Sequence, residues 1–172
     1  MREDVAGGSL LLKAAMNFND TEVTNKGELE TPAELAAYTS SVLLGRQNTV
    51  RYESSSPREN FQFSATLQKP TSTLMVKLNR WGEVTIPAST VEREQVLGSK
   101  FTVDTEYSFQ VNSQVRLAFG ANNLFDVYPD KTIKRNSFNG IFQHSGYSPF
   151  GFNGRYILSL IHISEPTRQW SI

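Results

Sequence analysis

The sequence predicts an all-β fold: part of an antiparallel transmembrane β-barrel, with about six long strands and long loops between them. Three observations predict it. Apolar and polar residues alternate along several segments, these segments are long, and short connections alternate with long ones. Because successive side chains of a strand point to opposite faces, the alternation predicts strands with one apolar and one polar face.

Composition excludes several classes of protein. The 172 residues include 17 Lys+Arg and 17 Asp+Glu, so no surplus of cations exists to meet nucleic-acid phosphates, and we expect no nucleic-acid partner. The chain has no cysteine, which excludes disulfides and thiolate metal sites. No apolar run approaches the roughly 20 residues of a transmembrane helix.

Five segments alternate clearly, and a sixth begins to do so. In residues 60–68, Phe61, Phe63, Ala65 and Leu67 fall on one face, and polar residues fall on the other. The predicted strands are residues 9–19, 60–68, 73–79, 101–111 and 114–122, with the start of another at 152–156. Several exceed the usual length of soluble strands, about 5–6 residues, and reach the roughly 9–11 residues that cross a bilayer.

The connections are of two kinds. Residues 70–72 and 112–113 are tight turns, whereas residues 20–57, 87–99 and 129–148 are long, polar segments. This asymmetry is typical of bacterial outer-membrane barrels, which have short periplasmic turns and long extracellular loops. In the first long segment, the capping-box pattern Thr31-Pro32-Ala33-Glu34 predicts a short helix, which Gly45 could end.

Alternation alone leaves open which face points inward. The apolar face lines the interior of a soluble barrel but contacts lipid in a membrane barrel, where the polar face lines the lumen. Strand length and loop asymmetry favour the membrane barrel. The residues then expected to face the lumen are Gln62, Ser64, Thr66, Lys77, Asp104, Glu106 and Arg116. About six strands leave two unpaired edges, so we expect this chain to be part of a larger barrel.

The last residues resemble no protein element. Residues 158–168 read LSLIHISEPTR, which matches the translation of a transposon-based sequencing adapter. We therefore expect residues 158–172 to be adapter read-through and residues 1–157 to be a single native barrel portion, cut off near Ile157.

Two segments near the end carry a family resemblance. Residues 120–130 read GANNLFDVYPD and residues 147–156 read YSPFGFNGRY. Together they resemble the C-terminal end of TonB-dependent outer-membrane receptors, in which such stretches end the penultimate strand and open the last one. Weaker supporting pieces extend the resemblance from about residue 17 to residue 156. The residues of the first motif segment are Asn122, Asn123, Leu124, Phe125 and Asp126, and those of the second are Ser148, Pro149, Phe150, Gly151, Phe152, Asn153, Gly154 and Arg155.

The resemblance implies a plugged barrel of about 22 strands, of which this chain would supply roughly the last quarter. It implies energy-coupled uptake of a scarce ligand: a siderophore, haem, cobalamin or a glycan. The plug, the energy-coupling box, the signal peptide and the usual aromatic C-terminal residue are absent from this sequence. The implied partners are outer-membrane lipid, the missing plug and strands, the TonB complex through the missing N-terminal part, and an unidentified small-molecule ligand.

The sequence contains no constellation typical of an active site. His144 has no partner His or Cys nearby in the sequence and is expected to be a solvated loop residue. Asp104 and Glu106 share a face, but the cations on the polar faces indicate a mixed-charge wall rather than a catalytic pair. We expect no enzymatic activity, cofactor or metal. Asn122, Asn123 and Asp126 are expected to form a turn, and Phe125 and Tyr128 an interfacial aromatic girdle.

Two alternatives to the receptor stay open. A passive porin or another outer-membrane barrel, including a barrel enzyme, would show the same strands and loops. A soluble β-barrel or sandwich that binds an apolar ligand would show the same alternation with the opposite facing.

Overall fold

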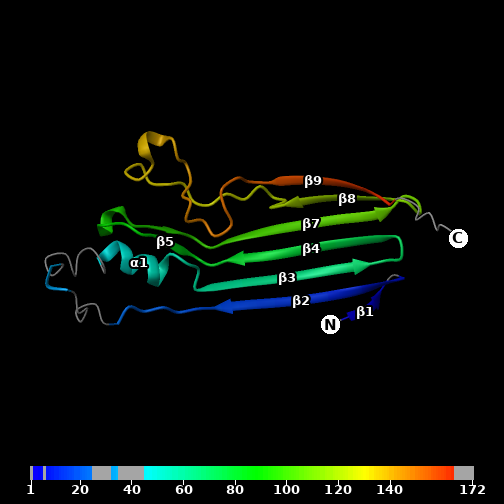
Figure 1. Ribbon diagram of the computed structural model, residues 1–172, viewed down its shortest axis with the longest axis horizontal. Coiled ribbons are helices and arrows are strands. Elements are labelled where there is room, and N and C mark those ends of the chain that lie inside the picture. The colour runs from blue at the N-terminus through cyan, green and yellow to red at the C-terminus, as the bar shows by residue number, and fades with distance from the viewer. Residues whose placement is uncertain (1, 6, 25–31, 35–44, 165–172) are drawn as a thin grey trace.

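The computed structural model describes residues 2–5, 7–24, 32–34 and 45–164. Within them, seven strands form one antiparallel sheet in the order β1-β2-β3-β4-β7-β8-β9 (Figure 1). Their bounds are β1 (Arg2–Val5), β2 (Gly8–Phe18), β3 (Glu59–Gln68), β4 (Ser72–Trp81), β7 (Lys100–Gln110), β8 (Val115–Asn122) and β9 (Tyr156–Ile163). The prediction of an all-β, antiparallel fold with about six long strands is confirmed, and the short strand β1 joins them.

The remaining elements lie in the long connections. Helix α1 (Arg46–Ser54) lies between β2 and β3, and a two-stranded sheet of β5 (Val84–Ile86) and β6 (Gln95–Leu97) lies between β4 and β7. Val91–Arg93 in the β5–β6 hairpin and Phe138–Gly140 in the loop before β9 form 3-10 turns. No helix among the described residues has the length and apolar character needed to span a membrane.

Short and long connections lie at opposite ends of the sheet. The β3–β4 and β7–β8 turns share one end, whereas α1, the β5–β6 hairpin and the loop before β9 share the other (Figure 1). The Asn112 side chain closes the β7–β8 turn because its Oδ1 accepts the N–H groups of Gln114 and Val115, both at 2.9 Å. The predicted asymmetry is confirmed, and we call the two sides the short-turn end and the long-loop end.

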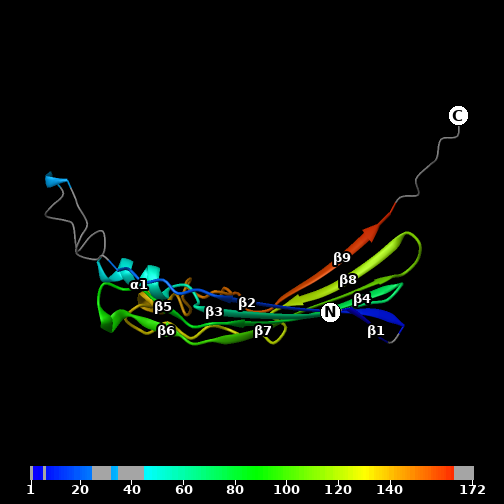
Figure 2. The same ribbon diagram turned by 90° about the horizontal axis from the view of Figure 1, so that it is seen from below.

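The main sheet is a single curved layer seen nearly edge-on in Figure 2. Its apolar face carries Phe63, Val76 and Phe119, and its polar face carries Lys77 and Asp104. The large apolar side chains are exposed: Val76 by 40%, Phe119 by 51% and Met16 by 64%. Polar Asn79, Thr102 and Ser108 are instead buried. The distribution is the reverse of that in a soluble protein, where buried side chains are mostly apolar.

Several sequence expectations need correction. The described helix of the first loop, α1, begins after Gly45, which occupies its N-cap position with φ −60° and ψ 159°. Of the capping-box pattern, Ala33 and Glu34 lie in a 3-10 turn, whereas Thr31 and the residues 35–44 that follow the pattern lie outside the described residues. The segment 87–99, expected as a long polar loop, contains β6 and a 3-10 turn. In the β5–β6 hairpin, Val84 lies directly opposite Leu97, and both residues are buried.

The last strand also differs from expectation. It begins at Tyr156 rather than Phe152, because Gly151 and Gly154 adopt positive φ angles of 78° and 73° that an extended strand does not allow. It also continues through Leu158 to Ile163, in antiparallel register with β8. Residues 148–155 therefore form a loop that precedes the strand, not its first residues.

Candidate functional site

The seven residues expected to line a lumen share the polar face of the sheet. Three cross-strand rows contain six of them: Gln62, Asn79 and Thr102; Ser64, Lys77 and Asp104; Thr66, Met75 and Glu106. Arg116 lies opposite Gln110 on the same face, and its Nε donates to the Gln110 amide oxygen at 3.2 Å. Register therefore brings together residues that lie up to 54 positions apart, from Gln62 to Arg116.

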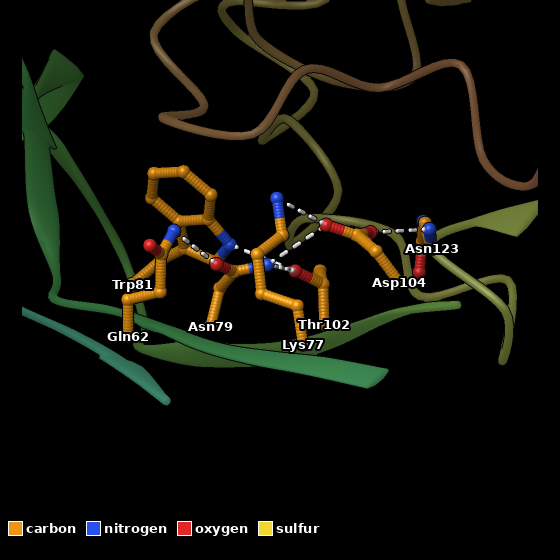
Figure 3. A network of polar contacts seen from close by, with 7 residues as sticks. All are labelled: Gln62, Lys77, Asn79, Trp81, Thr102, Asp104 and Asn123. Atoms are coloured by element: carbon orange, nitrogen blue, oxygen red, sulfur yellow. Dashed lines mark hydrogen bonds and ion pairs between the residues drawn. The ribbon is translucent and has the colours of Figure 1, made fainter. Parts of the chain in front are cut away.

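Seven residues of this face form a continuous polar network, shown in Figure 3: Gln62, Lys77, Asn79, Trp81, Thr102, Asp104 and Asn123. Asn79 is its centre. Its Oδ1 accepts from Gln62 Nε2 at 3.0 Å, and its Nδ2 donates to Asp104 Oδ2 at 3.1 Å and to Thr102 Oγ1 at 3.4 Å. Gln62 and Thr102 lie directly opposite Asn79 on the two neighbouring strands, and Asp104 is its diagonal neighbour, so all three lie within side-chain reach.

Asp104 connects this network to the end of β8. Its Oδ2 lies 3.0 Å from Lys77 Nζ, and its Oδ1 accepts the backbone N–H of Asn123 at 2.9 Å. The side chains of Lys77 and Asp104 are exposed by 33% and 15%. The carboxylate is thus neutralised and hydrogen-bonded at both oxygens, as a partly buried charge requires. It holds the first motif segment against the sheet.

Trp81 extends the network toward the long-loop end. Its Nε1 donates to Thr102 Oγ1 at 3.0 Å, which places the indole on the polar face. The ring of Phe150 packs near it, with centroids 6.3 Å apart. The loop that contains the second motif segment therefore folds over the polar face and covers Asn79 and Thr102, which are only 5% and 4% exposed.

The first motif segment makes a tight turn at the end of β8. Asn123 and Asp126 adopt the left-handed conformation, with φ 51° and 59°. The Asn123 side chain closes the turn because its Oδ1 accepts from Val127 N at 2.9 Å and its Nδ2 donates to Val127 O at 2.7 Å. Asn and Asp tolerate this backbone conformation better than other residues with a Cβ, which accounts for their presence here. The expectation of a turn agrees with this geometry.

The two motif segments contact each other. Asp126 Oδ1 accepts the backbone N–H of Arg155 at 2.8 Å, and Arg155 Nη1 donates to Leu124 O at 3.3 Å. Gly154 lies against the Asp126 carboxylate and the Tyr128 hydroxyl. Within the second segment, buried Ser148 donates through Oγ to Gly151 O at 2.7 Å. These contacts give the segments a structural role: they fix the entry into β9.

Polar contacts also hold the loop after the first motif segment in place. Asp130 accepts from Lys100 Nζ and from Gly98 N, both at 2.7 Å. The hydrogen bond from Lys100, followed by that from Gly98, lowers the pKa of Asp130 from its usual value. Gln95 of β6 donates to Lys131 O at 2.8 Å and accepts from Ile133 N at 3.0 Å. No local sequence pattern predicts these contacts, because they join residues 30 or more positions apart.

One sequence expectation about the loops differs from the structure. His144 is not a fully solvated residue, because its ring stacks on Tyr128 with centroids 5.4 Å apart and its Nδ1 is buried. Phe125 and Tyr128 are 69% and 43% exposed, as an aromatic girdle would require. Within the described residues, no group of three His, Cys, Asp or Glu side chains is arranged to bind a metal ion.

Comparison with known proteins gives limited information. No family model matches the chain, and no curated protein matches it. Among solved structures, it is similar to a mutant (R480A_Q482A) of the ferric enterobactin receptor PfeA from Pseudomonas aeruginosa, with a TM-score of 0.46 and 13% identity. That alignment covers 94% of this chain and 30% of the receptor chain. A likeness of this size assigns no family.

Proposed function

We propose that this chain is part of the barrel wall and outer mouth of a TonB-dependent receptor in a bacterial outer membrane. Such a receptor takes up a scarce ligand, a siderophore, haem, cobalamin or a glycan, with energy supplied through the TonB complex. The observation that carries the proposal is the reversed burial of the sheet, which exposes its apolar face and covers its polar face.

The reversed burial favours lipid as the neighbour of the apolar face. Among the described residues, the buried apolar side chains are Val84, Leu97 and Ala121, and none of these belongs to the middle of the main sheet. Water makes so large an exposed apolar face unfavourable, whereas hydrocarbon does not. Strands β2, β3, β4 and β7 have 10 or 11 residues, which is enough to cross a bilayer.

Among the possible membrane barrels, the motif segments favour a receptor. Their resemblance to TonB-dependent receptors rests on sequence, and their mutual contact through Asp126 and Arg155 supports the view that they work as one unit. In the receptor, the short-turn end would be periplasmic and the long-loop end extracellular. The polar network would then face the lumen and the missing plug.

The other expected properties belong to the same proposal. The partners would be outer-membrane lipid, the plug and remaining strands of the barrel, the TonB complex through the N-terminal part, and a small-molecule ligand. We propose no enzymatic activity, cofactor or nucleic-acid partner, and we interpret the Lys77–Asp104 ion pair as part of a mixed-charge wall.

The facing of the sheet can be tested at two neighbouring residues. Val76 lies on the apolar face and Met75 on the polar face, opposite Glu106. Because the chain has no cysteine, Val76→Cys and Met75→Cys each create a single labelling site. We expect an environment-sensitive fluorophore at position 76 to be quenched by spin-labelled lipid in phospholipid vesicles, and the same fluorophore at position 75 to be quenched only by aqueous iodide.

Equal quenching at the two positions, or lipid quenching at position 75 alone, would contradict the membrane facing and favour the soluble β-barrel. A porin would give the same labelling result as a receptor. Sequencing of the source locus separates these two: a receptor requires a plug domain and an energy-coupling box upstream, and a porin gene has strands directly after the signal peptide.

We also propose that residues 158–172 are adapter read-through. The pattern of β9 supports this proposal, because Leu158 and Leu160 lie on the polar face opposite Gly120 and Ala118, and Ser159 lies on the apolar face opposite Phe119. The polar faces of β3 and β7, by contrast, carry only polar or charged side chains, such as Gln62 and Asp104. Sequencing through this end of the frame should replace residues 158–172 with a strand that keeps the alternation. A natural stop codon after Ile172 would contradict the proposal.

A further inference from the structure

The long-loop end contains an open hollow whose lining carries both signs of charge. Its volume is about 860 Å³, and it lies where β2 ends, β3 begins and β4 ends. Its charged side chains are Asp20, Arg58, Glu59, Arg80 and Glu83, and we call it the charged hollow. A ligand can reach these groups, because the side chains of Arg80 and Glu59 are 32% and 49% exposed.

Register places part of the charged hollow at the border of the apolar face. Arg80 lies opposite Phe61 of β3 and Phe101 of β7, and Glu59 lies opposite Phe18 of β2. Phe18 and Phe101 are exposed. In a membrane barrel, aromatic rings gather where hydrocarbon meets the lipid headgroups, and a long cationic side chain at this depth extends toward the headgroups. The charged hollow is therefore at the level of the headgroups if the apolar face contacts lipid.

The ion pairs of the charged hollow leave hydrogen-bonding groups available. Arg80 Nη1 donates to Glu59 Oε1 at 2.6 Å, which uses one of five guanidinium donors and one of two carboxylate oxygens. Arg58 and Asp20 are linked only by a contact of 3.5 Å. None of the ion pairs among the described residues includes Glu83. Two guanidinium groups and three carboxylates can thus interact with a ligand.

These charges define the chemistry of the occupant. Guanidinium groups bind phosphate oxygens through paired, charge-assisted hydrogen bonds. Three carboxylates in the same hollow would repel a ligand that carries negative charge alone, whereas an ammonium group offers them three N–H donors. The best match is a headgroup in which a phosphate and an ammonium group lie close together.

We propose that the charged hollow binds the headgroup of a membrane lipid that carries both a phosphate and a primary ammonium group. Arg58 and Arg80 bind the phosphate, Glu59 and Glu83 bind the ammonium group, and the neighbouring Phe18 contacts the acyl chains. The inference rests on the membrane facing of the proposed function. It adds a specific lipid contact at the rim of the barrel wall.

The test uses the full 172-residue chain folded in lauryldimethylamine oxide micelles. Phosphatidylethanolamine, phosphatidylcholine and phosphatidylglycerol with identical acyl chains are added separately at the same concentration. The nitrogen of phosphatidylcholine has no N–H group, and phosphatidylglycerol has no ammonium group. Native mass spectrometry should show that the chain retains phosphatidylethanolamine about fivefold or more better than either other lipid.

Substitutions assign this preference to the charged hollow. Arg80→Gln should lower the retention of phosphatidylethanolamine by about tenfold, because a charged partner of the phosphate is lost. Glu59→Gln should lower it too and should raise the retention of phosphatidylglycerol, because a negative charge is removed. Arg116→Gln, on the polar face opposite Gln110, is the control and should change neither. Circular dichroism checks the strands of each variant, and Arg58→Gln replaces Arg80→Gln if the latter does not fold.

The proposal is overturned if phosphatidylethanolamine is retained no better than the other two lipids. It is also overturned if Arg116→Gln lowers retention as much as Arg80→Gln, or if Glu59→Gln leaves the preference over phosphatidylglycerol unchanged.

These outcomes are independent of the labelling at Val76 and Met75. A preference for phosphatidylethanolamine without lipid quenching at position 76 would keep the headgroup site and reject the outer-membrane receptor. Lipid quenching at position 76 without that preference would do the reverse.

Discussion

At the scale of single residues, two glycines of the second motif segment allow the effect of backbone strain to be distinguished from the effect of steric contact. Gly151 and Gly154 have nearly the same φ, 78° and 73°, which disfavours any residue with a Cβ. A Cβ at Gly151 would meet nothing within 4 Å. A Cβ at Gly154 would meet the Tyr128 hydroxyl and, at 2.6 Å, Asp126 Oδ1.

We therefore expect Gly154→Ala to destabilise the chain more than Gly151→Ala. The control variant should lose about 1 kcal/mol because of its φ alone, and Gly154→Ala about 2–3 kcal/mol. Urea unfolding followed by tryptophan fluorescence measures both. Equal losses would mean that the contact of Gly154 with Asp126 and Tyr128 does not limit the packing of the two motif segments.

Asp130 gives a pH dependence at the same scale. Its pKa is lowered by the hydrogen bonds from Lys100 and Gly98, so the folded chain favours the ionised carboxylate. A lowered folded pKa adds stability at pH values above the ordinary carboxyl pKa, near 4, and this stability is lost as the pH falls through the folded value.

Because the Asp130 side chain is 40% exposed, we expect the substitution Asp130→Asn to lower the unfolding temperature by only about 1–3 °C. The difference in unfolding temperature between wild type and Asp130→Asn should be largest above pH 5 and shrink toward pH 2. Lys100→Met should reduce the same pH dependence. A difference that stays constant from pH 6 to pH 2 would show that the carboxylate charge is not what stabilises this loop.

At the scale of elements, the polar network joins β3, β4 and β7 to the end of β8. Lys77 and Asp104 are directly opposed in the β4–β7 register and partly buried. Arg58 and Asp20 provide a matched pair at the long-loop end, 3.5 Å apart with side chains 63% and 79% exposed. Burial should therefore decide how much each ion pair contributes.

A double-mutant cycle measures the difference. Lys77→Met combined with Asp104→Asn should give a coupling free energy of about 1–2 kcal/mol, whereas Arg58→Met with Asp20→Asn should give about 0–0.3 kcal/mol. The free energy of unfolding is obtained from urea titration of each variant. A coupling as small for Lys77 and Asp104 as for the exposed pair would show that water screens the polar face fully.

At the scale of the whole molecule, the described part of the main sheet forms one layer with two free edges. β1 and β9 each pair on one side only, so the described residues do not close a barrel. Open edges leave backbone N–H and C=O groups unpaired, which hydrocarbon does not tolerate. The proposed membrane facing therefore also requires additional strands, and the quenching difference between positions 75 and 76 should become sharper when those strands are present.

The sequence alone determined the five clearly alternating strands, β2, β3, β4, β7 and β8, and which of their side chains share a face. The period of two is a local property, so residues 60–68 and 101–111 could be assigned from their own alternation. The turn at Asn112 and the left-handed turn at Asn123 follow from residue types that favour such backbones. The resemblance of the motif segments also needed no structure.

Only the tertiary structure decided which of these segments contact one another. Asn79 becomes the centre of a network because register places it between Gln62 and Thr102, and Asp126 reaches Arg155 across a loop. The arrangement of the loop before β9 likewise depends on the bridge between Lys131 and His144. Such contacts arise from the packing of distant segments, which no short-range pattern encodes. Periodicity therefore predicts the strands of the main sheet, and three-dimensional packing decides how the loops at the long-loop end are arranged.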